Sequence, residues 1–264
     1  MSELVSREAL DGILVLRLQD PPANTYSYDM MRQLDAAILD ARMDDAVHVV
    51  VLTGAGDKFF CAGANIKMLT KVTPRFKYFF CLHANETLAR LEQTPKLVIA
   101  ALNGHCVGGG LEVAMAADLR WARKGAGRMG LPEVGLGVLP GTGGTQRLVR
   151  LVGKARALEL MATGRLFEFE EAQALGLVHE VLEAPDAGAF LEQVLARARE
   201  FAPPHRASKA VGLIKRAVHS GAESAFAEAL GLERELQQQL FESEDAREGL
   251  EAHVAKRRPV FRGR

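Results

Sequence analysis

The chain has 264 residues, of which 48% are hydrophobic and 25% charged, and its formal net charge is zero. Such a chain can bury a sizeable core, and its balanced charge argues against a nucleic-acid-binding or membrane-surface protein. The amino terminus carries acidic residues early, without the basic region and apolar run of a secretory signal, and no apolar run reaches the roughly 18 residues of a membrane span. Cys61, Cys81 and Cys106 share no CxxC spacing, so we expect no disulfide framework and a reducing, cytoplasmic compartment.

Four apolar segments have the composition of buried strands, namely residues 12–20, 47–54, 96–104 and the shorter 118–122. The segments between them read as helices. In the first of these, residues 27–43, the apolar side chains recur at the spacing of one helix face, at Met30, Met31, Leu34, Ile38 and Leu39. Alternating helices and buried strands predict an α/β fold with largely parallel strand pairing.

The strand pattern stops near residue 186, and the rest of the chain reads as helical. Pro203 and Pro204 open one helical segment, and Ser220 and Gly221 precede another. We therefore divide the chain into an α/β core over residues 1–195 and a helical region over residues 196–264.

Several common site motifs are excluded. Residues 125–130 match GxGxxG, but Pro132 and Gly135 follow directly, where a dinucleotide site needs a helix that begins within the motif. The patterns GxxxxGK[ST], GxSxG and HExxH are absent. The seven histidines are scattered, and none shares metal-ligand spacing with a cysteine, so no metal site is predicted.

A glycine triplet, Gly108 to Gly110, lies at the start of an apolar segment that reads as a helix. The first amide groups of a helix have no partner inside it, and glycine lets a ligand approach the backbone closely. A second glycine-rich turn, residues 61–67, follows the predicted strand 47–54 and its loop. Two backbone amides aimed at one oxygen would stabilise the enolate of a thioester.

Two acids accompany these turns. Glu112 lies just past the triplet, and Glu133 stands in a proline-fixed, glycine-flanked turn that is otherwise nearly apolar. Partial burial of two neighbouring carboxylates raises at least one pKa, as general acid and base roles at neutral pH require. Plainer interpretations stay open: Glu112 as an acid at a helix amino terminus, Glu133 as an exposed acid, and the triplet as close helix-on-strand packing.

At these residues the sequence resembles the enoyl-CoA hydratase/isomerase (crotonase) superfamily, and is most similar to its hydratases. The matching blocks span nearly the whole chain: VVVLTGAGDKFFCAGANIKML, KLVIAALNGHCVGGGLEVAMAADLRWA, MGLPEVGLGVLPGTGGTQRLVRLVGKARALELMATG, EAQALGLVHEVL and DAREGLEAHVAKRRPVF. The resemblance implies a spiral of ββα units with a C-terminal helical trimerisation region. It also implies a homo-oligomer, expected to be a hexamer built as a dimer of trimers.

The resemblance also assigns roles to residues. It implies that the amides of Ala64 and Gly109 form the oxyanion hole for the thioester carbonyl. Glu112 matches the glutamate that orients and deprotonates water for attack at C3, and Glu133 matches the one that delivers a proton to C2. The stretch from Ala62 to Lys67 is expected to line the CoA site.

Within that stretch the substrate-binding residues are expected to be Ala62, Asn65, Ile66 and Lys67, with Lys67 as a contact for the nucleotide phosphates. No cofactor is implied, because CoA is part of the acyl-CoA substrate. The expected reaction is hydration of a trans-2-enoyl-CoA to a 3-hydroxyacyl-CoA. The alternatives are an enoyl-CoA isomerase, with Glu133 shuttling a proton and Glu112 idle, and a catalytically silent acyl-CoA-binding protein.

Departures from the family pattern bear on the substrate. Tyr26 replaces part of the common NALS motif, and Asn65 stands where aspartate is commoner. The variable acyl-chain region, residues 69–88, contains four aromatic residues that suggest an apolar wall, although core packing would explain them equally: Phe76, Tyr78, Phe79 and Phe80.

Overall fold

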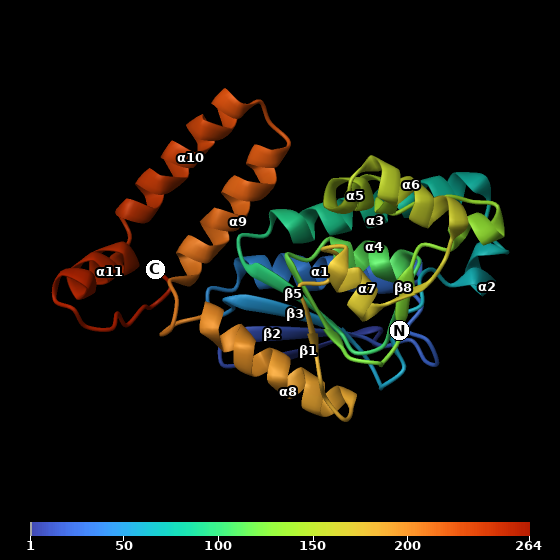
Figure 1. The fold of residues 1–264 in the computed structure, drawn as a ribbon, viewed down its shortest axis with the longest axis horizontal. Helices are drawn as coiled ribbons and strands as arrows, with labels where there is room; N and C mark the ends of the chain where they lie inside the picture. The colour runs from blue at the N-terminus through green and yellow to red at the C-terminus, as the bar shows by residue number, and fades with distance from the viewer. Residues whose placement is uncertain (1) are drawn as a thin grey trace.

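A computed structural model describes residues 2–264 and contains two β-sheets flanked by helices (Figure 1). The larger sheet has six strands in the order β1-β2-β3-β5-β7-β10. These strands are β1 (Val5–Leu10), β2 (Ile13–Leu18), β3 (Val49–Gly54), β5 (Leu97–Leu102), β7 (Leu119–Arg123) and β10 (Glu180–Leu182). Among the described strands of this sheet, only β1 and β2 pair antiparallel, so the predicted α/β architecture with largely parallel pairing is confirmed.

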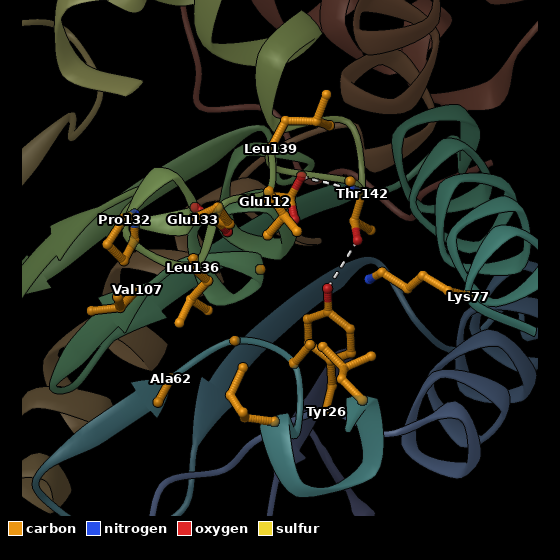
Figure 2. A pocket seen from close by; sticks show the side chains of 18 of the residues that line it. Tyr26, Ala62, Lys77, Val107, Glu112, Pro132, Glu133, Leu136, Leu139 and Thr142 are labelled. Carbon is orange, nitrogen blue, oxygen red and sulfur yellow. Dashed lines mark hydrogen bonds between the residues drawn. The ribbon is translucent and has the colours of Figure 1, made fainter. Parts of the chain in front are cut away.

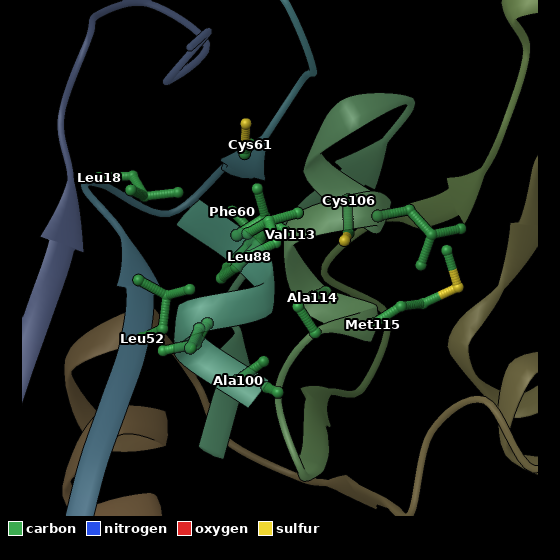
Figure 3. Packing of buried hydrophobic residues seen from close by; sticks show 14 of the residues in the cluster. Leu18, Leu52, Phe60, Cys61, Leu88, Ala100, Cys106, Val113, Ala114 and Met115 are labelled. Carbon is green, nitrogen blue, oxygen red and sulfur yellow. The ribbon is translucent and has the colours of Figure 1, made fainter. Parts of the chain in front are cut away.

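Helices cover both faces of this sheet. Alternate strand residues point to opposite sides, and the apolar residues on each side need a helix to bury them. Val50 and Leu52 of β3 face the core formed with α1 (Tyr28–Met43) and α3 (Pro74–Gln93), whereas Val51 faces a second core with α8 (Ala187–Ala198). Figure 1 shows α1 and α3 on one side of the strands and α8 on the other. Figure 3 shows the larger core, in which Leu52 and Ala100 of the six-stranded sheet belong to one cluster with Phe60 of β4 (Phe59–Cys61) and Val113 of α4 (Gly109–Met115).

The smaller sheet forms the layer that carries the glycine-rich turns. Its order is β4-β6-β8-β9, with β4 (Phe59–Cys61), β6 (His105–Val107), β8 (Arg128–Gly130) and β9 (Phe167–Glu168). The surrounding helices are α2 (Ile66–Leu69), α4 (Gly109–Met115), the 3₁₀ helix Glu133–Leu136, α5 (Gly144–Val152), α6 (Lys154–Thr163) and α7 (Phe169–Ala174). Residues 125–130 form a turn and β8 rather than the start of a helix, which confirms that they are not a dinucleotide motif.

The C-terminal helices extend away from the sheets (Figure 1). After the short 3₁₀ helix Arg199–Phe201 come α9 (Ser208–Ala222), α10 (Phe226–Phe241) and α11 (Glu244–Val254). The boundary that we placed at residue 195 falls inside α8, whose Phe190 and Val194 pack on the large sheet. In the structure, α8 therefore belongs to the body, and the projecting helices begin with α9.

Across residues 2–264, no helix combines the length and apolarity needed to cross a membrane. The three cysteines are free, as expected from their spacing.

A buried ion pair ties α9 to the body. The ammonium of Lys215 on α9 lies 2.9 Å from Asp118 Oδ2, with both side chains at most 10% exposed. Lys215 also donates to the carbonyls of Leu91 and Lys96, each at 3.1 Å, and Asp118 accepts the amide of Val98 at 2.7 Å. Burial lowers the pKa of Lys215, while the charge of Asp118 opposes this shift. The pair is thus stable as a unit, and removal of one partner would leave a buried charge.

We predict that Lys215→Met lowers the free energy of unfolding by about 3–5 kcal/mol, because Asp118 loses its ammonium partner in a low-dielectric site and keeps the side-chain contact with His219 Nε2 at 3.0 Å. Urea denaturation at fixed protein concentration would measure this. The matched control is Lys209→Met, an exposed lysine of the same helix, for which a change within about 0.5 kcal/mol is expected. Equal, small decreases in the free energy of unfolding for both variants would contradict a stabilising role of the Lys215–Asp118 pair.

Candidate active site

A pocket of about 470 Å³ opens between the two glycine-rich turns, the 133–139 segment and the start of α3. This volume is typical of small-molecule sites. Both Glu112 and Glu133 line it, and Figure 2 shows their carboxyl groups on the same side of the pocket. The two acids that are far apart in the sequence are therefore neighbours in one site.

The start of α4 can be built only from glycines. Gly108 has φ of +57°, and a Cβ there would lie 3.0 Å from Glu133 Oε1. A Cβ on Gly109 would lie 2.3 Å from the hydroxyl of Tyr26, and one on Gly110 would lie 2.1 Å from the carbonyl oxygen of Cys61. The interpretation of the triplet as close packing is thus correct for Gly110, while Gly108 and Gly109 lie on the pocket.

The second turn is held in place by the backbone of Tyr26. The Tyr26 amide donates to the Gly63 carbonyl at 2.9 Å, and the Asn65 amide donates to the Tyr26 carbonyl at 3.0 Å. These bonds leave the intervening amide of Ala64 without a hydrogen-bond acceptor in the described chain, and the same holds for the first amide of α4, on Gly109. A Cβ on Gly63 would lie 3.0 Å from the Gly109 nitrogen, so the two turns are in contact. Two residues whose amides have no acceptor in the described chain therefore line one pocket.

Glu112 is fixed by two amides from the turn that precedes α5. Its Oε1 accepts the amides of Thr142 and Gly144, each at 2.7 Å. The side chain is only 2% exposed, and burial raises its pKa, although the amides of Gly144 and Thr142 act in the opposite direction. Glu112 is thus a buried, oriented carboxyl group, and it also lies in the first turn of α4, as the plainer interpretation expected.

Glu133 lines the same pocket and has a different environment. Its Oε2 is buried and has no hydrogen-bond partner among residues 2–264. The pKa of Glu133 is raised to about 7, mainly by burial and also by the charge of Glu112. The backbone amide of Glu133 and the charge of Lys77 oppose this rise. The alternative of an exposed acid after a proline is therefore wrong. A carboxyl group with this pKa can give or take a proton at neutral pH.

Six of the eight predicted site residues line the pocket: Ala62, Ala64, Ile66, Gly109, Glu112 and Glu133. Asn65 instead caps α2, where its side chain accepts the amide of Met68 at 3.0 Å. Lys67 is exposed and lies outside the lining. The roles of both toward CoA stay predictions.

None of the four aromatic residues of the variable region lines the pocket. Phe80 is buried in the core, whereas Phe76, Tyr78 and Phe79 are exposed. The apolar wall is aliphatic instead and consists of Leu69, Val72, Leu136, Val138 and Leu139.

The sequence reasoning missed three residues of the site. Thr142 and Gly144 supply the amides that bind Glu112, and the glycine-rich turn directly before an amphipathic helix was a usable signal, because such turns present free amides. Lys77 carried no comparable signal. For a metal ion, residues 2–264 contain no suitable group of three or more His, Cys, Asp or Glu.

Comparison with known proteins identifies the family. The family model for enoyl-CoA hydratase/isomerase matches residues 8–264. A short-chain-enoyl-CoA hydratase of Clostridium acetobutylicum is 37% identical over 247 residues, covering 93% of this chain and 92% of the relative. A crotonyl-CoA hydratase of Syntrophomonas wolfei is 33% identical over 260 residues, covering 98% of both.

The solved structures agree with these sequence matches. A crystal structure of an enoyl-CoA hydratase from Geobacillus kaustophilus has a TM-score of 0.95 at 43% identity, and the match covers 100% of this chain and 98% of that one. The fold is therefore the crotonase fold that the motifs predicted. The chain belongs to the enoyl-CoA hydratase/isomerase family of enzymes.

Proposed function

We propose that the protein adds water to a trans-2-enoyl-CoA and forms a 3-hydroxyacyl-CoA. The observation that carries this proposal is the meeting of two carboxyl groups with raised pKa values and two free amides on one pocket. The names of the hydratase relatives support it at the level of the family. In this proposal the acyl-CoA is the substrate and the reaction needs no further cofactor.

The two amides would bind the thioester oxygen. During addition at C3 the substrate becomes an enolate, and negative charge develops on that oxygen. Fixed donors at Ala64 and Gly109 would stabilise this charge without reorganisation. One well-placed donor lowers the activation free energy by roughly 3–4 kcal/mol. The aliphatic wall keeps the site poor in water, which strengthens these interactions.

The two acids would divide the proton transfers. Glu112, ionised and held by Thr142 and Gly144, takes a proton from water as the water oxygen bonds to C3. Glu133, protonated, gives its proton to C2 as the enolate collapses. One hydrogen and one hydroxyl are thereby added across the double bond, and a proton passes from the Glu112 side to the Glu133 side to reset the pair.

The predicted effect of Glu112→Gln is a loss of about 10²–10⁴ in kcat for hydration, because the amide keeps the shape of the carboxylate but takes no proton. Mass spectrometry of products from crotonyl-CoA would measure the water added. The control is Glu86→Gln, an exposed acid of α3, which should retain activity. Near-wild-type hydration by the Glu112 variant would exclude its role as the base.

A 3-enoyl-CoA isomerase is the second candidate, and one observation favours it. Glu133 has an unpaired buried oxygen and a pKa of about 7, so it is able to take and return a proton without Glu112. Separate incubations with 3-enoyl-CoA and 2-enoyl-CoA distinguish the candidates, because only hydration adds the mass of water. Glu112→Gln would leave isomerisation measurable.

The pKa of Glu133 predicts the pH profile of the reaction. The protonated form is the donor, and its fraction falls as pH rises through about 7, so kcat/KM should decline on the alkaline side with an apparent pKa near that value. Because the two acids interact, the value belongs to the pair. Stopped or continuous assays over a pH series in constant ionic strength would measure it. A flat profile from neutral to mildly alkaline pH would contradict Glu133 as the donor.

We also infer that the chain forms a homo-oligomer through its projecting helices, with a hexamer of two trimers as the expected state. The support is the large apolar side chains left uncovered there, including Phe226 at 79% exposed, Phe241 at 68% and Val254 at 82%. Isolated exposed apolar residues are ordinary, but several on a helix pair that extends from the body are typical of an interface.

A further inference from the structure

Lys77 is a cation without a counter-charge in direct contact. It lies in the first turn of α3, and among the residues that line the pocket it alone is positively charged. Within residues 2–264 its ammonium takes part in no ion pair or hydrogen bond, and it lies 5.4 Å from the centroid of the Phe80 ring. The side chain is half-buried. Its charge is therefore available to a ligand in the pocket.

The ammonium is directed at one end of the pocket. Figure 2 shows the Lys77 side chain pointing toward the hydrogen bond between the hydroxyls of Tyr26 and Thr142, which are 2.9 Å apart. The amide of this same Thr142 binds Glu112. Lys77 thus points toward Thr142, which holds Glu112, while its charge also acts on Glu133 and lowers the pKa of that acid.

The direction of the substrate follows from the proposed function. With the thioester oxygen on the amides of Ala64 and Gly109, C2 lies beside Glu133 and C3 beside Glu112. The acyl chain beyond C3 then continues past Glu112 toward Thr142 and the ammonium of Lys77. The CoA portion leaves on the other side of the thioester, so Lys77 meets the acyl chain rather than the nucleotide.

An uncharged alkyl chain is a poor occupant for this end of the pocket. It would displace water from the ammonium and offer no acceptor in return, which is unfavourable for a charged group. A carboxylate would form a charge-assisted hydrogen bond to the ammonium. The first turn of the 20-residue helix α3 also favours negative charge at this position.

We propose that Lys77 determines substrate specificity and that the pocket takes acyl-CoA thioesters whose acyl chain carries a carboxylate. This inference rests on the proposed function for the orientation of the acyl chain. Lys77 binds the distal carboxylate, while the aliphatic wall contacts the methylene groups between it and the thioester.

Binding of saturated thioesters tests the proposal separately from turnover. Calorimetry on the full chain would compare succinyl-, glutaryl- and adipyl-CoA with butyryl-, valeryl- and hexanoyl-CoA, matched in length. We expect one diacid of the series to bind about tenfold or more tightly than its uncharged counterpart. In Lys77→Met this preference should vanish, while the affinity for the uncharged chain changes little. Lys71→Met, an exposed lysine outside the pocket, is the matched control and should keep the preference.

The outcomes separate the inference from the proposed function. Equal weakening of diacid and uncharged thioesters in Lys77→Met would assign Lys77 to the CoA phosphates or to structure and would overturn the inference. Tighter binding of uncharged chains by the wild type would do the same, even if the enzyme hydrates them. A Lys77-dependent preference for a diacid, without hydration of the corresponding 2-enoyl diacid thioester, would support the inference and count against hydration.

Discussion

The contact between Tyr26 and Gly109 is the constraint on which the rest of the site depends. The backbone of Tyr26 pairs with the turn that carries Ala64, and its ring lies so close to Gly109 that no Cβ fits between them. Its hydroxyl binds Thr142, whose amide binds Glu112. One buried side chain therefore connects both free amides and one of the acids. Geometry of this kind is what electrostatic catalysis requires, because donors that are already oriented need no reorganisation in the transition state.

The same arrangement explains why two neighbouring acids have different properties. Both lose solvation, which raises both pKa values. Glu112 regains part of that stabilisation from the amides of Thr142 and Gly144, whereas the orphaned Oε2 of Glu133 regains none. Hydrogen bonds from two amides thus oppose the rise in pKa at Glu112, whereas no hydrogen bond to Oε2 opposes it at Glu133. The hydrogen bonds therefore give different environments to two carboxyl groups that are chemically alike.

The sequence predicted the architecture where its signals were local. Strands such as residues 47–54 are continuous apolar runs buried on both faces, and the helix 28–43 has a clear apolar face and a Ser27 cap. Short strands such as β4 and β9 were missed, because two or three residues give no periodicity and their pairing is decided by distant segments. The division at residue 195 fell inside α8, because the contacts that join this helix to the sheet are tertiary.

Prediction of the site followed the same division. The glycines and acids of the glycine-rich turns could be recognised in the sequence, because the chemistry needs these residue types at fixed places along the chain. Tyr26 was noticed only as a departure from the family motif, and its contact with Gly109 depends on how two turns meet. The aromatic residues of α3 were ambiguous, because the helix has a wide apolar surface and the sequence does not say which part faces the pocket. Aliphatic residues from two stretches, residues 69–72 and 136–139, form the wall instead.

Two lysines that are at least partly shielded from solvent differ in whether their charge has partners, and this difference separates a structural role from a ligand-binding role. Lys215 is surrounded by Asp118 and two carbonyl oxygens, so nothing is left for a ligand and its role ends with joining α9 to the body. Lys77 reaches a cavity with no such partners in the described chain, and the nearby charge of Glu133 is reduced whenever that acid holds its proton. A folded chain rarely leaves a sheltered charge without compensation. The missing compensation at Lys77 is therefore best supplied by the substrate, which makes the acyl end of this pocket selective by charge as well as by shape.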